Sequence, residues 1–399
     1  MSQSRRVLGG WRAIWIRVRL RLLARLRLGH REQAAAGPVV AGGLVLSGFL
    51  SHNSGVGAAA RLTLAALEAA GLAPVAHEID LGRGALRRAD GRLPGEDGVW
   101  FIHANAMETL AVLMSHDPTQ WRARRRIAYW VWETPLAPTD WALAARYVHQ
   151  IWTPSVFSAE AIRAGLAAAG AGHLADRVVV MPHPVPVAPV APRDEAAGVI
   201  ALTMFDALSA VARKNPQGAI DAWLEAFPRP APGLRLIIKA RNLSPAQRAA
   251  LLDRLAGRSD VELMERELDP AGVAALTSAA DITLSLHRSE GFGLPLAEAM
   301  ARGGCVLCTG WSGNMDFMDE TCAALVPFGL VDIDDPEGIY RGSHWAEPDV
   351  AAAGVRLRAL AEDPEQRRRL GERARARIAD LSLPWRPDRL KAVLRGELQ

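Results

Sequence analysis

The chain has 399 residues, half of them hydrophobic, which suits two globular domains with complete cores and excludes a disordered chain. Its net charge of +4 arises at the amino terminus, because residues 1–31 contain nine arginines and no acidic residue, and the rest carries 38 basic against 43 acidic side chains. This balance argues against nucleic-acid binding by the body of the chain. No apolar run approaches the roughly 20 residues that a membrane-spanning helix needs.

The first 36 residues form a basic amphipathic segment in which arginine is interspersed with Leu, Ile and Trp. Two periods compete there: residues 17–22 alternate as in a strand, whereas a longer set follows helical spacing, namely Trp11, Trp15, Val18, Leu22 and Leu26. The helical interpretation predicts attachment to an anionic membrane surface, peripheral on its inner face. The alternative is an appendage that packs on the body. Deleting residues 1–34 separates the two, since unchanged binding to anionic vesicles would exclude the membrane interpretation.

Three cysteines, Cys305, Cys308 and Cys322, favour a reducing compartment, and we expect a cytoplasmic protein. The spacing of Cys305 and Cys308 also occurs in zinc and redox sites. However, the chain has no second cysteine pair, and these two lie in an apolar strand-like run. We therefore expect a structural role for both.

Residues 37–190 alternate between strand-like and helix-like segments, which predicts a Rossmann-like α/β domain. The expected strands are 43–47, 73–79, 99–103, 127–132, 150–153 and 178–181, and the expected helices are 58–70, 107–114, 141–147 and 155–168. The proline-rich residues 184–192 indicate a hinge.

The alternation restarts in residues 191–383 and predicts a second Rossmann-like domain. The expected strands are 199–204, 234–239, 261–264, 282–286, 306–309 and 323–326, and the expected helices are 216–226, 245–256, 270–279, 295–302, 350–361 and 364–380. Ser244-Pro245 and Asp269-Pro270 have the pattern of a helix cap followed by a first-turn proline.

An acidic and glycine-rich string, residues 289–298, follows the expected strand 282–286. It places Glu290 in the strand-to-helix loop and Glu298 about one turn into the next helix. Ligands of open parallel sheets bind at the carboxyl ends of strands, so both carboxylates are candidates for a binding cleft. Gly291 and Gly293 permit close approach of a ligand to the backbone, and the amides at the helix start favour a phosphate.

The string 289–298 resembles the acidic motif, two glutamates separated by seven residues, of the retaining GT-B glycosyltransferases known as glycosyl transferases group 1. The resemblance continues at residues 213–216, 309–317 and 345–349. It implies an α/β fold of two Rossmann-like domains facing an interdomain cleft. The first would be the acceptor side and the second the nucleotide-sugar donor domain, with residues 384–399 crossing back onto the first.

The resemblance also implies roles in the second domain. Glu290 would contact the donor sugar and stabilise positive charge at its anomeric carbon, and Glu298 would accept hydrogen bonds from the ribose. Backbone amides would come from Gly291, Phe292, Gly293 and Leu294. Arg213 and Lys214, just before the expected helix at Pro216, would join Glu290 as catalytic residues by meeting the diphosphate. Relatives often carry a further arginine at the end of the preceding strand, where this chain has Met204, Phe205 and Asp206. Asn314 and Asp316 would form another cleft loop, with helix capping as the alternative.

In the first domain, residues 48–57 end in a glycine-rich turn that opens a helix. Gly55 and Gly57 there are candidates for contact with the donor phosphates or the acceptor, and a plain tight turn is the alternative. Many relatives place a sugar-contacting histidine where this chain has residues 130–133. We therefore consider Glu133 or the neighbouring His103 as a sugar or acceptor contact.

The sequence 332–334 imitates the Asp-x-Asp metal site of a different glycosyltransferase architecture, but a turn fits its position better. Cationic side chains can supply the charge that a metal would, so we expect no metal and no cofactor beyond the nucleotide-sugar donor.

These features predict a metal-independent retaining glycosyltransferase. It would move a hexosyl unit, mannosyl by preference, to a glycan or lipid-linked acceptor in surface polysaccharide synthesis. One alternative is a nucleotide-sugar epimerase, which would lack the strings at 213–215 and 309–317. Another is a non-catalytic nucleotide-binding or scaffold protein of the same fold.

Overall fold

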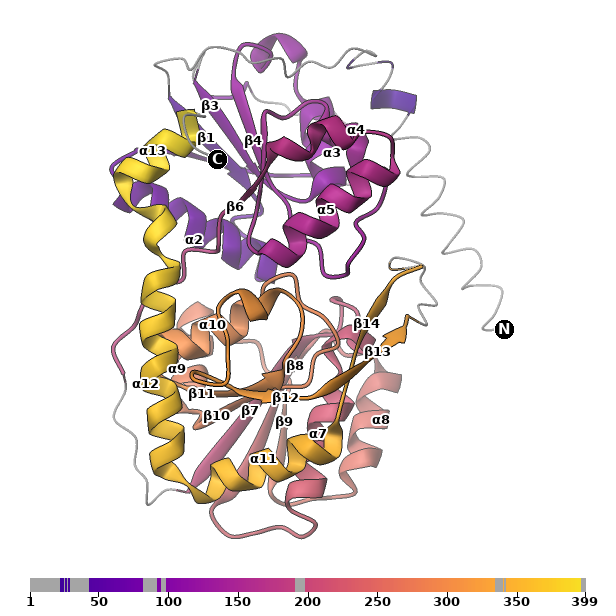
Figure 1. Ribbon diagram of the computed structural model, residues 1–399, viewed down its shortest axis with the longest axis vertical. Helices are drawn as coiled ribbons and strands as arrows, with labels where there is room; N and C mark the ends of the chain where they lie inside the picture. The colour runs from indigo at the N-terminus through magenta and orange to yellow at the C-terminus, as the bar shows by residue number, and fades with distance from the viewer. Residues whose placement is uncertain are drawn as a thin grey trace. The chain divides into compact units, whose positions relative to one another are not determined.

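The computed structural model describes residues 22–24, 26, 28, 43–81, 92–94, 98–190, 198–333, 340 and 342–395. Most of the basic amino-terminal segment, and Asp334, lie outside these residues. The chain forms two compact units (Figure 1). The first contains residues 1–184, 332–343 and 384–399, and the second contains 185–331 and 344–383. In the described part of the chain, no helix is long and apolar enough to cross a membrane.

The first unit is built on a six-stranded sheet in the order β2-β1-β3-β4-β5-β6, in which neighbouring strands pair in parallel. Its strands are β1 (Leu44–Gly48), β2 (Val75–Glu78), β3 (Val99–His103), β4 (Arg125–Tyr129), β5 (Gln150–Thr153) and β6 (Val178–Val180). β1 and β3 are neighbours, with Gly48 opposite His103. The strand order reverses between them, so their carboxyl ends flank a topological switch point.

Helices and short 3-10 turns connect these strands: α2 (Gly55–Ala69), α3 (Ala106–Ser115), η1 (Pro118–Gln120), α4 (Trp141–Ala145), α5 (Val156–Ala168) and η2 (Gly172–Arg177). Ser54 caps α2 and Ser155 caps α5, and each side chain accepts a hydrogen bond from a backbone amide of its helix. The carboxyl-terminal η5 (Leu383–Trp385) and α13 (Pro387–Arg395) follow. Trp385 and Leu390 lie in the same hydrophobic core as Phe101 and Trp152, so the end of the chain is part of this unit.

The second unit has a six-stranded sheet in the order β12-β11-β10-β7-β8-β9, again with parallel pairings. Its strands are β7 (Val199–Asp206), β8 (Leu234–Arg241), β9 (Val261–Met264), β10 (Ile282–Ser285), β11 (Cys305–Thr309) and β12 (Ala324–Val326). The switch point lies between β7 and β10. Cys305 and Cys308 are buried free thiols within β11.

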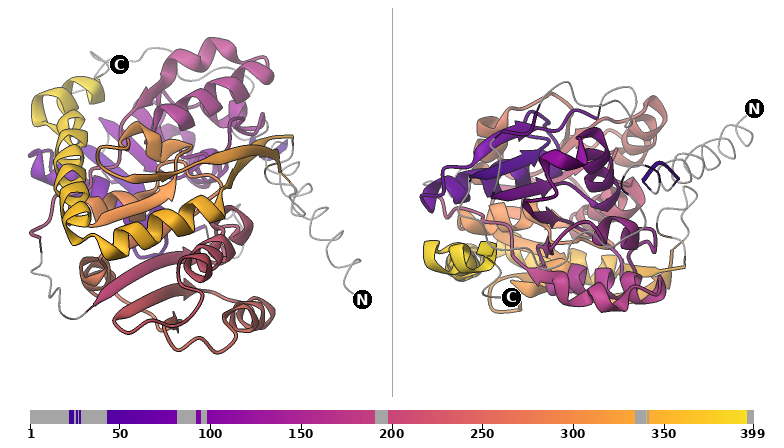
Figure 2. Two further views of the ribbon diagram at one scale, coloured as in Figure 1. Left: turned by 60° about the horizontal axis from the view of Figure 1, so that its bottom comes forward. Right: turned by 90° about the horizontal axis from the view of Figure 1, so that it is seen from above.

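The helices of this unit are α6 (Val211–Lys214), α7 (Pro216–Ala226), α8 (Pro245–Leu255), α9 (Pro270–Ala279), α10 (Leu294–Ala301), η4 (Gly313–Asp316), α11 (Val350–Glu362) and α12 (Pro364–Leu381). Ser244 and Asp269 cap α8 and α9 ahead of a first-turn proline, as their sequences predict. The helices α11 and α12 follow each other directly in the chain and are drawn in orange-yellow to yellow in Figure 2. Apolar residues of α7 and α11 share one core with β7, β8 and β10.

A two-stranded ribbon, β13 (Phe328–Asp332) and β14 (His344–Pro348), is absent from the expected elements. All five β13 residues are exposed, so no apolar alternation marks the strand. Asp332 ends β13, where we expected only a turn. β4 also ends earlier than expected, at Tyr129, and residues 130–132 lie beyond the sheet.

Candidate functional site

The switch point of the second sheet brings together two segments that are distant in sequence. α6 follows β7, and the loop 286–293 follows β10, the neighbour of β7. The carboxyl ends of adjacent parallel strands lie at one edge of the sheet, which is where ligands of such sheets bind. Arg288 N donates to Arg213 O over 2.8 Å, so the two segments are also joined through their backbones.

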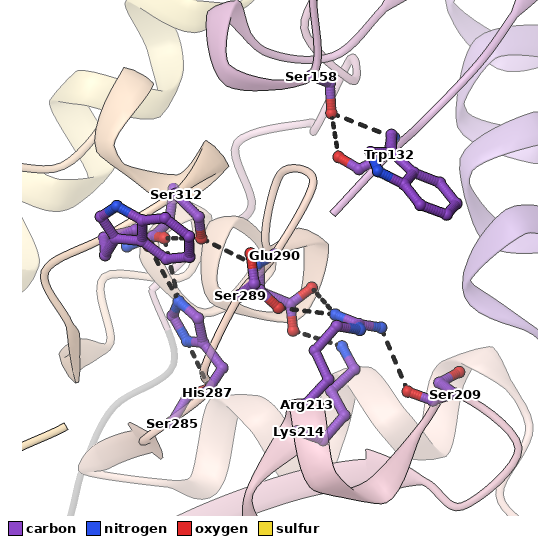
Figure 3. Close-up of polar contacts among 12 residues, drawn as sticks. Trp132, Ser158, Ser209, Arg213, Lys214, Ser285, His287, Ser289, Glu290 and Ser312 are labelled. Carbon is purple, nitrogen blue, oxygen red and sulfur yellow. Dashed lines mark hydrogen bonds and ion pairs between the residues drawn. The ribbon is translucent and has the colours of Figure 1, made fainter. Parts of the chain in front are cut away.

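An ion cluster of Glu290, Arg213 and Lys214 occupies this edge (Figure 3). Lys214 Nζ lies 2.5 Å from Glu290 Oε1, and Arg213 Nη1 lies 3.3 Å from Oε2. Arg213 also donates to the carbonyls of Ser289 (2.8 Å) and Ser209 (3.3 Å). Arg213 is 4% exposed and Glu290 8% exposed, so the cluster is held inside the protein. The three residues expected to act together are therefore in contact, with both cations paired to Glu290.

Charge in this cluster is unequal, with two cations facing one carboxylate. Burial alone would raise the pKa of the Glu290 carboxyl, but the Lys214 and Arg213 cations outweigh it and lower this pKa to about 2. Burial lowers the pKa of the neighbouring His287, which favours its neutral form at pH 7. The three charged side chains thus carry one net positive charge, which suits a group with negative charge such as a phosphate.

The depressed pKa of Glu290 predicts acid lability. Because the folded pKa lies below the ordinary 4.5, the carboxylate contributes stability above about pH 4.5, and this contribution is lost as the pH falls toward 2. We expect an extra loss of about 1 kcal/mol per pH unit between these limits relative to Glu290→Gln. Urea denaturation of both proteins at pH 5.5, 4.0 and 3.0 measures it. Equal pH slopes for the two proteins would contradict the assigned pKa.

The backbone of Glu290 is held by the loop after β11. Ser312 Oγ accepts from Glu290 N over 2.8 Å, and Gly313 N donates to Glu290 O over 2.9 Å. Ser312 adopts φ 79° and ψ −152°, a region that is nearly exclusive to glycine and costs about 1–3 kcal/mol for other residues. The loop therefore keeps a strained serine whose hydroxyl fixes the peptide of Glu290.

Two variants of Ser312 test whether its backbone is strained and whether its hydroxyl stabilises the peptide of Glu290. Ser312→Ala keeps the strain and leaves the buried Glu290 amide without an acceptor, so we expect a loss of about 1–3 kcal/mol in unfolding free energy. Ser312→Gly loses the same bond but relieves the strain, and we expect it to be more stable than Ser312→Ala. Urea denaturation compares the pair. A less stable glycine variant would show that the backbone conformation is not strained.

We expected Asn314 to belong to a cleft loop that contacts the donor, with helix capping as the alternative. Its side chain is completely buried, and its Oδ1 lies 3.1 Å from His287 Nε2 while its Nδ2 donates to Thr309 O over 3.2 Å. His287 Nδ1 in turn lies 3.1 Å from Ser285 Oγ. Both ends of the amide are used within the protein, so Asn314 supports the loop. Asp316 is exposed at the end of η4.

Glu298 lies on α10 and is half-buried. Burial raises the pKa of its carboxyl, and Arg302 only partly opposes this. Gly293 caps the helix at φ 92°, a left-handed conformation that favours glycine. Leu294 begins the helix, and Phe292 is buried with its ring 4.8 Å from that of Phe317. In this stretch Phe292 anchors the loop, and the helix start supplies backbone amides.

In the first unit, Gly57 was a candidate for contact with the donor phosphates or the acceptor, with a plain tight turn as the alternative. Its amide donates to Ser54 Oγ (3.2 Å) as part of the α2 cap, and a Cβ there would lie 2.2 Å from His52 O. The glycine is needed for close packing, and its amide is already used. Gly55 begins α2 with open space where a Cβ would be.

His103 is 2% exposed, and its ring stacks on Tyr129 at 4.5 Å, so both ring nitrogens lie inside the protein. Glu133 is half-buried in a fixed loop. There Ser158 Oγ donates to Trp132 O over 2.6 Å (Figure 3), and the Trp132 indole donates to Leu136 O over 2.8 Å. Of these two candidates, only Glu133 has surface for a direct ligand contact in this structure.

The sequence analysis did not identify Arg288 or His287 as site residues. Arg288 forms two hydrogen bonds with Glu347 (2.6 and 2.9 Å) and donates to Ala212 O (2.6 Å), while Ala346 N donates to Arg288 O. This residue therefore ties α6 and β14 to the loop that carries Glu290. The one available signal was Glu347, which lies in the motif at residues 345–349.

The chain is similar in part of its sequence to one protein family and in its fold to several solved structures. Residues 209–377 match the family model described as Glycosyl transferases group 1, and no curated protein sequence matches the chain. The structure is similar to HepE of Anabaena in complex with UDP and glucose, with 13% identity, a TM-score of 0.61, and coverage of 88% of this chain and 98% of that one. It is also similar to a glycosyltransferase of Rickettsia africae, with 11% identity, a TM-score of 0.60, and coverage of 90% and 99%.

A third similar structure is a variant of S. aureus TarM in complex with fondaparinux, α-GlcNAc-glycerol and UDP, with 10% identity and a TM-score of 0.55. That match covers 75% of this chain and 55% of TarM. At such identities the likeness concerns the fold. The expected α/β fold, two Rossmann-like units of the GT-B type, is confirmed.

Proposed function

We propose that this chain, whose residues 209–377 match the Glycosyl transferases group 1 model, transfers a hexosyl unit from a nucleotide sugar to a hydroxyl acceptor with retention of configuration. The observation that carries this proposal is the buried Glu290 paired with Lys214 and Arg213 at the switch point of the second sheet. A nucleotide-sugar diphosphate brings negative charge to this edge, and the cluster has positive charge to receive it.

In the proposed reaction, the bond between the anomeric carbon and the phosphate oxygen breaks, and the acceptor oxygen bonds to the same carbon from the same face. The electron pair of the broken bond stays on the diphosphate, where the two cations stabilise it. The acceptor proton passes to that phosphate oxygen. The Glu290 carboxylate, ionised at neutral pH because of its low pKa, stabilises the positive charge that develops on the sugar.

Glu298 and the backbone amides at the start of α10 also fit the donor. Within the part of the chain that the structure describes, the carboxyl of Glu298 has no side-chain hydrogen bond, and we assign it to the ribose hydroxyls. The amides at the start of α10 meet the phosphates. Since Lys214 and Arg213 neutralise the leaving group, we propose that transfer needs no metal and proceeds in a chelator.

A donor screen tests the function. UDP, GDP, ADP and TDP sugars are incubated with the protein in EDTA, and release of the nucleoside diphosphate is measured. We expect at least one donor to be turned over, and Glu290→Gln to abolish its turnover. If no donor releases its diphosphate, the non-catalytic alternative stands. If the sugar changes configuration while it remains linked to the nucleotide, the protein is an epimerase.

The similar structures guide the order of the screen. HepE and TarM were both solved with UDP, which favours UDP sugars as the first donors to test, ahead of the mannosyl donors that the sequence analysis preferred. A glycan or lipid-linked acceptor in surface polysaccharide synthesis remains our proposal for the setting. Peripheral attachment to a membrane through residues 1–34 is part of it.

A further inference from the structure

The amino-terminal edge of the first sheet gathers basic side chains. The neighbouring strands β4, β5 and β6 are parallel, so their amino ends meet at one edge, opposite the carboxyl ends where ligands of such sheets bind. The segments that enter these strands, residues 117–126, 144–150 and 172–178, contain six arginines and two histidines but only two acidic residues. This edge is therefore positive, although the chain after residue 31 has a slight acidic excess.

Two of these arginines, Arg126 and Arg177, connect the strand ends through carbonyl oxygens. Arg126 is completely buried and donates to Tyr147 O over 2.6 Å, and Arg177 donates to Val148 O over 2.8 Å. Carbonyl oxygens satisfy the N–H groups of an arginine but do not neutralise its charge. Both residues therefore shape the edge and also contribute to its positive potential.

Arg125, the first residue of β4, is held differently. It is half-buried, and within the described part of the chain its buried Nε has no hydrogen-bond partner. Burial lowers the pKa of its guanidinium, and no carboxylate of the described residues opposes this effect. A partly desolvated cation without a partner is unfavourable, and an anion placed against Arg125 would remove that cost.

His149 lies among these cations as a neutral hydrogen-bond donor. Its Nδ1 accepts from Arg126 N over 2.9 Å, which leaves the ring proton on Nε2. Burial, and then the charges of Arg126, Arg125 and Arg177, lower the pKa of this ring to about 3. The charged groups that act on the imidazole are thus all arginines, so the electrostatic potential around His149 is positive.

The cluster is open to solvent on one side. Arg122 and Arg146 are exposed, and the charge of Arg122 acts on Arg126. Of the two acidic residues in the three segments, Asp117 accepts two hydrogen bonds from Thr119, and Asp176 is exposed. A ligand from solvent would therefore meet an arginine-rich surface before it reaches Arg125.

We propose that this edge is an oxyanion site that takes a phosphate group, with the Arg125 guanidinium and the His149 Nε2–H as donors and the neighbouring arginines as the source of positive potential. Phosphate offers several acceptor oxygens and suits charge-assisted hydrogen bonds from arginine. Inorganic phosphate and a lipid headgroup share this chemistry. The site belongs to the first unit, whereas the Glu290 cluster belongs to the second, so the proposal does not rest on the transferase function.

Hydrogen–deuterium exchange with mass spectrometry on the full chain tests the site, in sodium phosphate and in sodium chloride of equal ionic strength. We expect phosphate to slow exchange in peptides that cover residues 120–126 and 146–150. Arg125→Gln should require at least tenfold more phosphate for the same protection, because a charge-assisted hydrogen bond is lost. Arg122→Gln, a second variant at an exposed position, should require about threefold more.

Two control variants separate this site from general charge effects and from the other candidate anion site. Arg229→Gln removes the same charge from an exposed arginine of the second unit, and Lys214→Met removes a cation from the Glu290 cluster. We expect phosphate to protect residues 120–126 in both as it does in the unmodified protein. Loss of this protection in Lys214→Met would place the phosphate at the Glu290 cluster and overturn the proposal.

Vesicles of phosphatidylcholine with and without phosphatidylglycerol distinguish the two sources of phosphate. Protection by inorganic phosphate that Arg125→Gln weakens supports a site for a free anion. Protection only by the phosphatidylglycerol vesicles, again weakened in Arg125→Gln, supports a site for a lipid headgroup. The proposal is overturned if neither probe protects these peptides, or if Arg125→Gln and Arg122→Gln are both protected as the unmodified protein is.

Discussion

Lys214→Met is expected to lower donor turnover by about 100- to 1,000-fold, the effect of removing one preorganised charge from a developing anion. The Lys214 ammonium lies 2.5 Å from Glu290 and belongs to the cationic pair that we assign to the leaving diphosphate. Methionine keeps most of the apolar stem, so packing is largely preserved while the charge is lost. The initial rate of nucleoside diphosphate release at saturating donor measures the effect.

The control is Lys391→Met on α13, where a lysine in the other unit is replaced in the same way. We expect its turnover to equal that of the unmodified protein. Turnover of Lys214→Met within threefold of the unmodified enzyme would remove this lysine from the catalytic residues.

Arg213→Ala is expected to destabilise the protein by about 3–5 kcal/mol, the usual result of removing one partner from a buried ion pair. Arg213 is 4% exposed and donates to two backbone carbonyls in addition to its contact with Glu290. Its removal leaves those carbonyls short of a donor and leaves the carboxylate with Lys214 alone. Urea denaturation at pH 7, followed by circular dichroism, measures the loss.

Arg235→Ala provides the comparison. Arg235 Nη2 lies 2.6 Å from Glu262, but the two side chains are 56% and 43% exposed, so solvent screens the pair and we expect a change of at most about 1 kcal/mol. Similar losses for both variants would show that burial does not distinguish the cluster from an ordinary surface pair.

Much of this fold could be predicted because parallel strands buried on both faces form continuous apolar runs. Strands such as 99–103 and 150–153 and helices such as 216–226 and 270–279 were expected with the bounds that the structure has. The ribbon β13–β14 could not be predicted in this way, since β13 is exposed along its whole length. The short α6 was missed because four residues are too few to show a helical period.

The candidate site was predictable where topology decides the outcome. Glu290 and Lys214 are 76 residues apart, yet both follow strands that meet at one switch point, so their contact follows from the strand order. The uses of Asn314 and Gly57 were not predictable. A sequence does not tell whether a polar group faces a ligand or a neighbouring loop, and here His287 and Ser54 are the partners. The strained Ser312 has no signal in the local sequence for the same reason.

The proposed transfer requires that the cluster of Glu290, Arg213 and Lys214 recognises the diphosphate of the donor. Isothermal titration calorimetry measures the preference for the diphosphate over the nucleoside directly. Uridine and UDP, or the corresponding pair for another base, are each titrated into the unmodified protein and into Lys214→Met. We predict that the unmodified protein binds the diphosphate at least 100-fold more tightly than the nucleoside, and that Lys214→Met loses at least tenfold of that preference. Equal preferences in the two proteins would contradict the account.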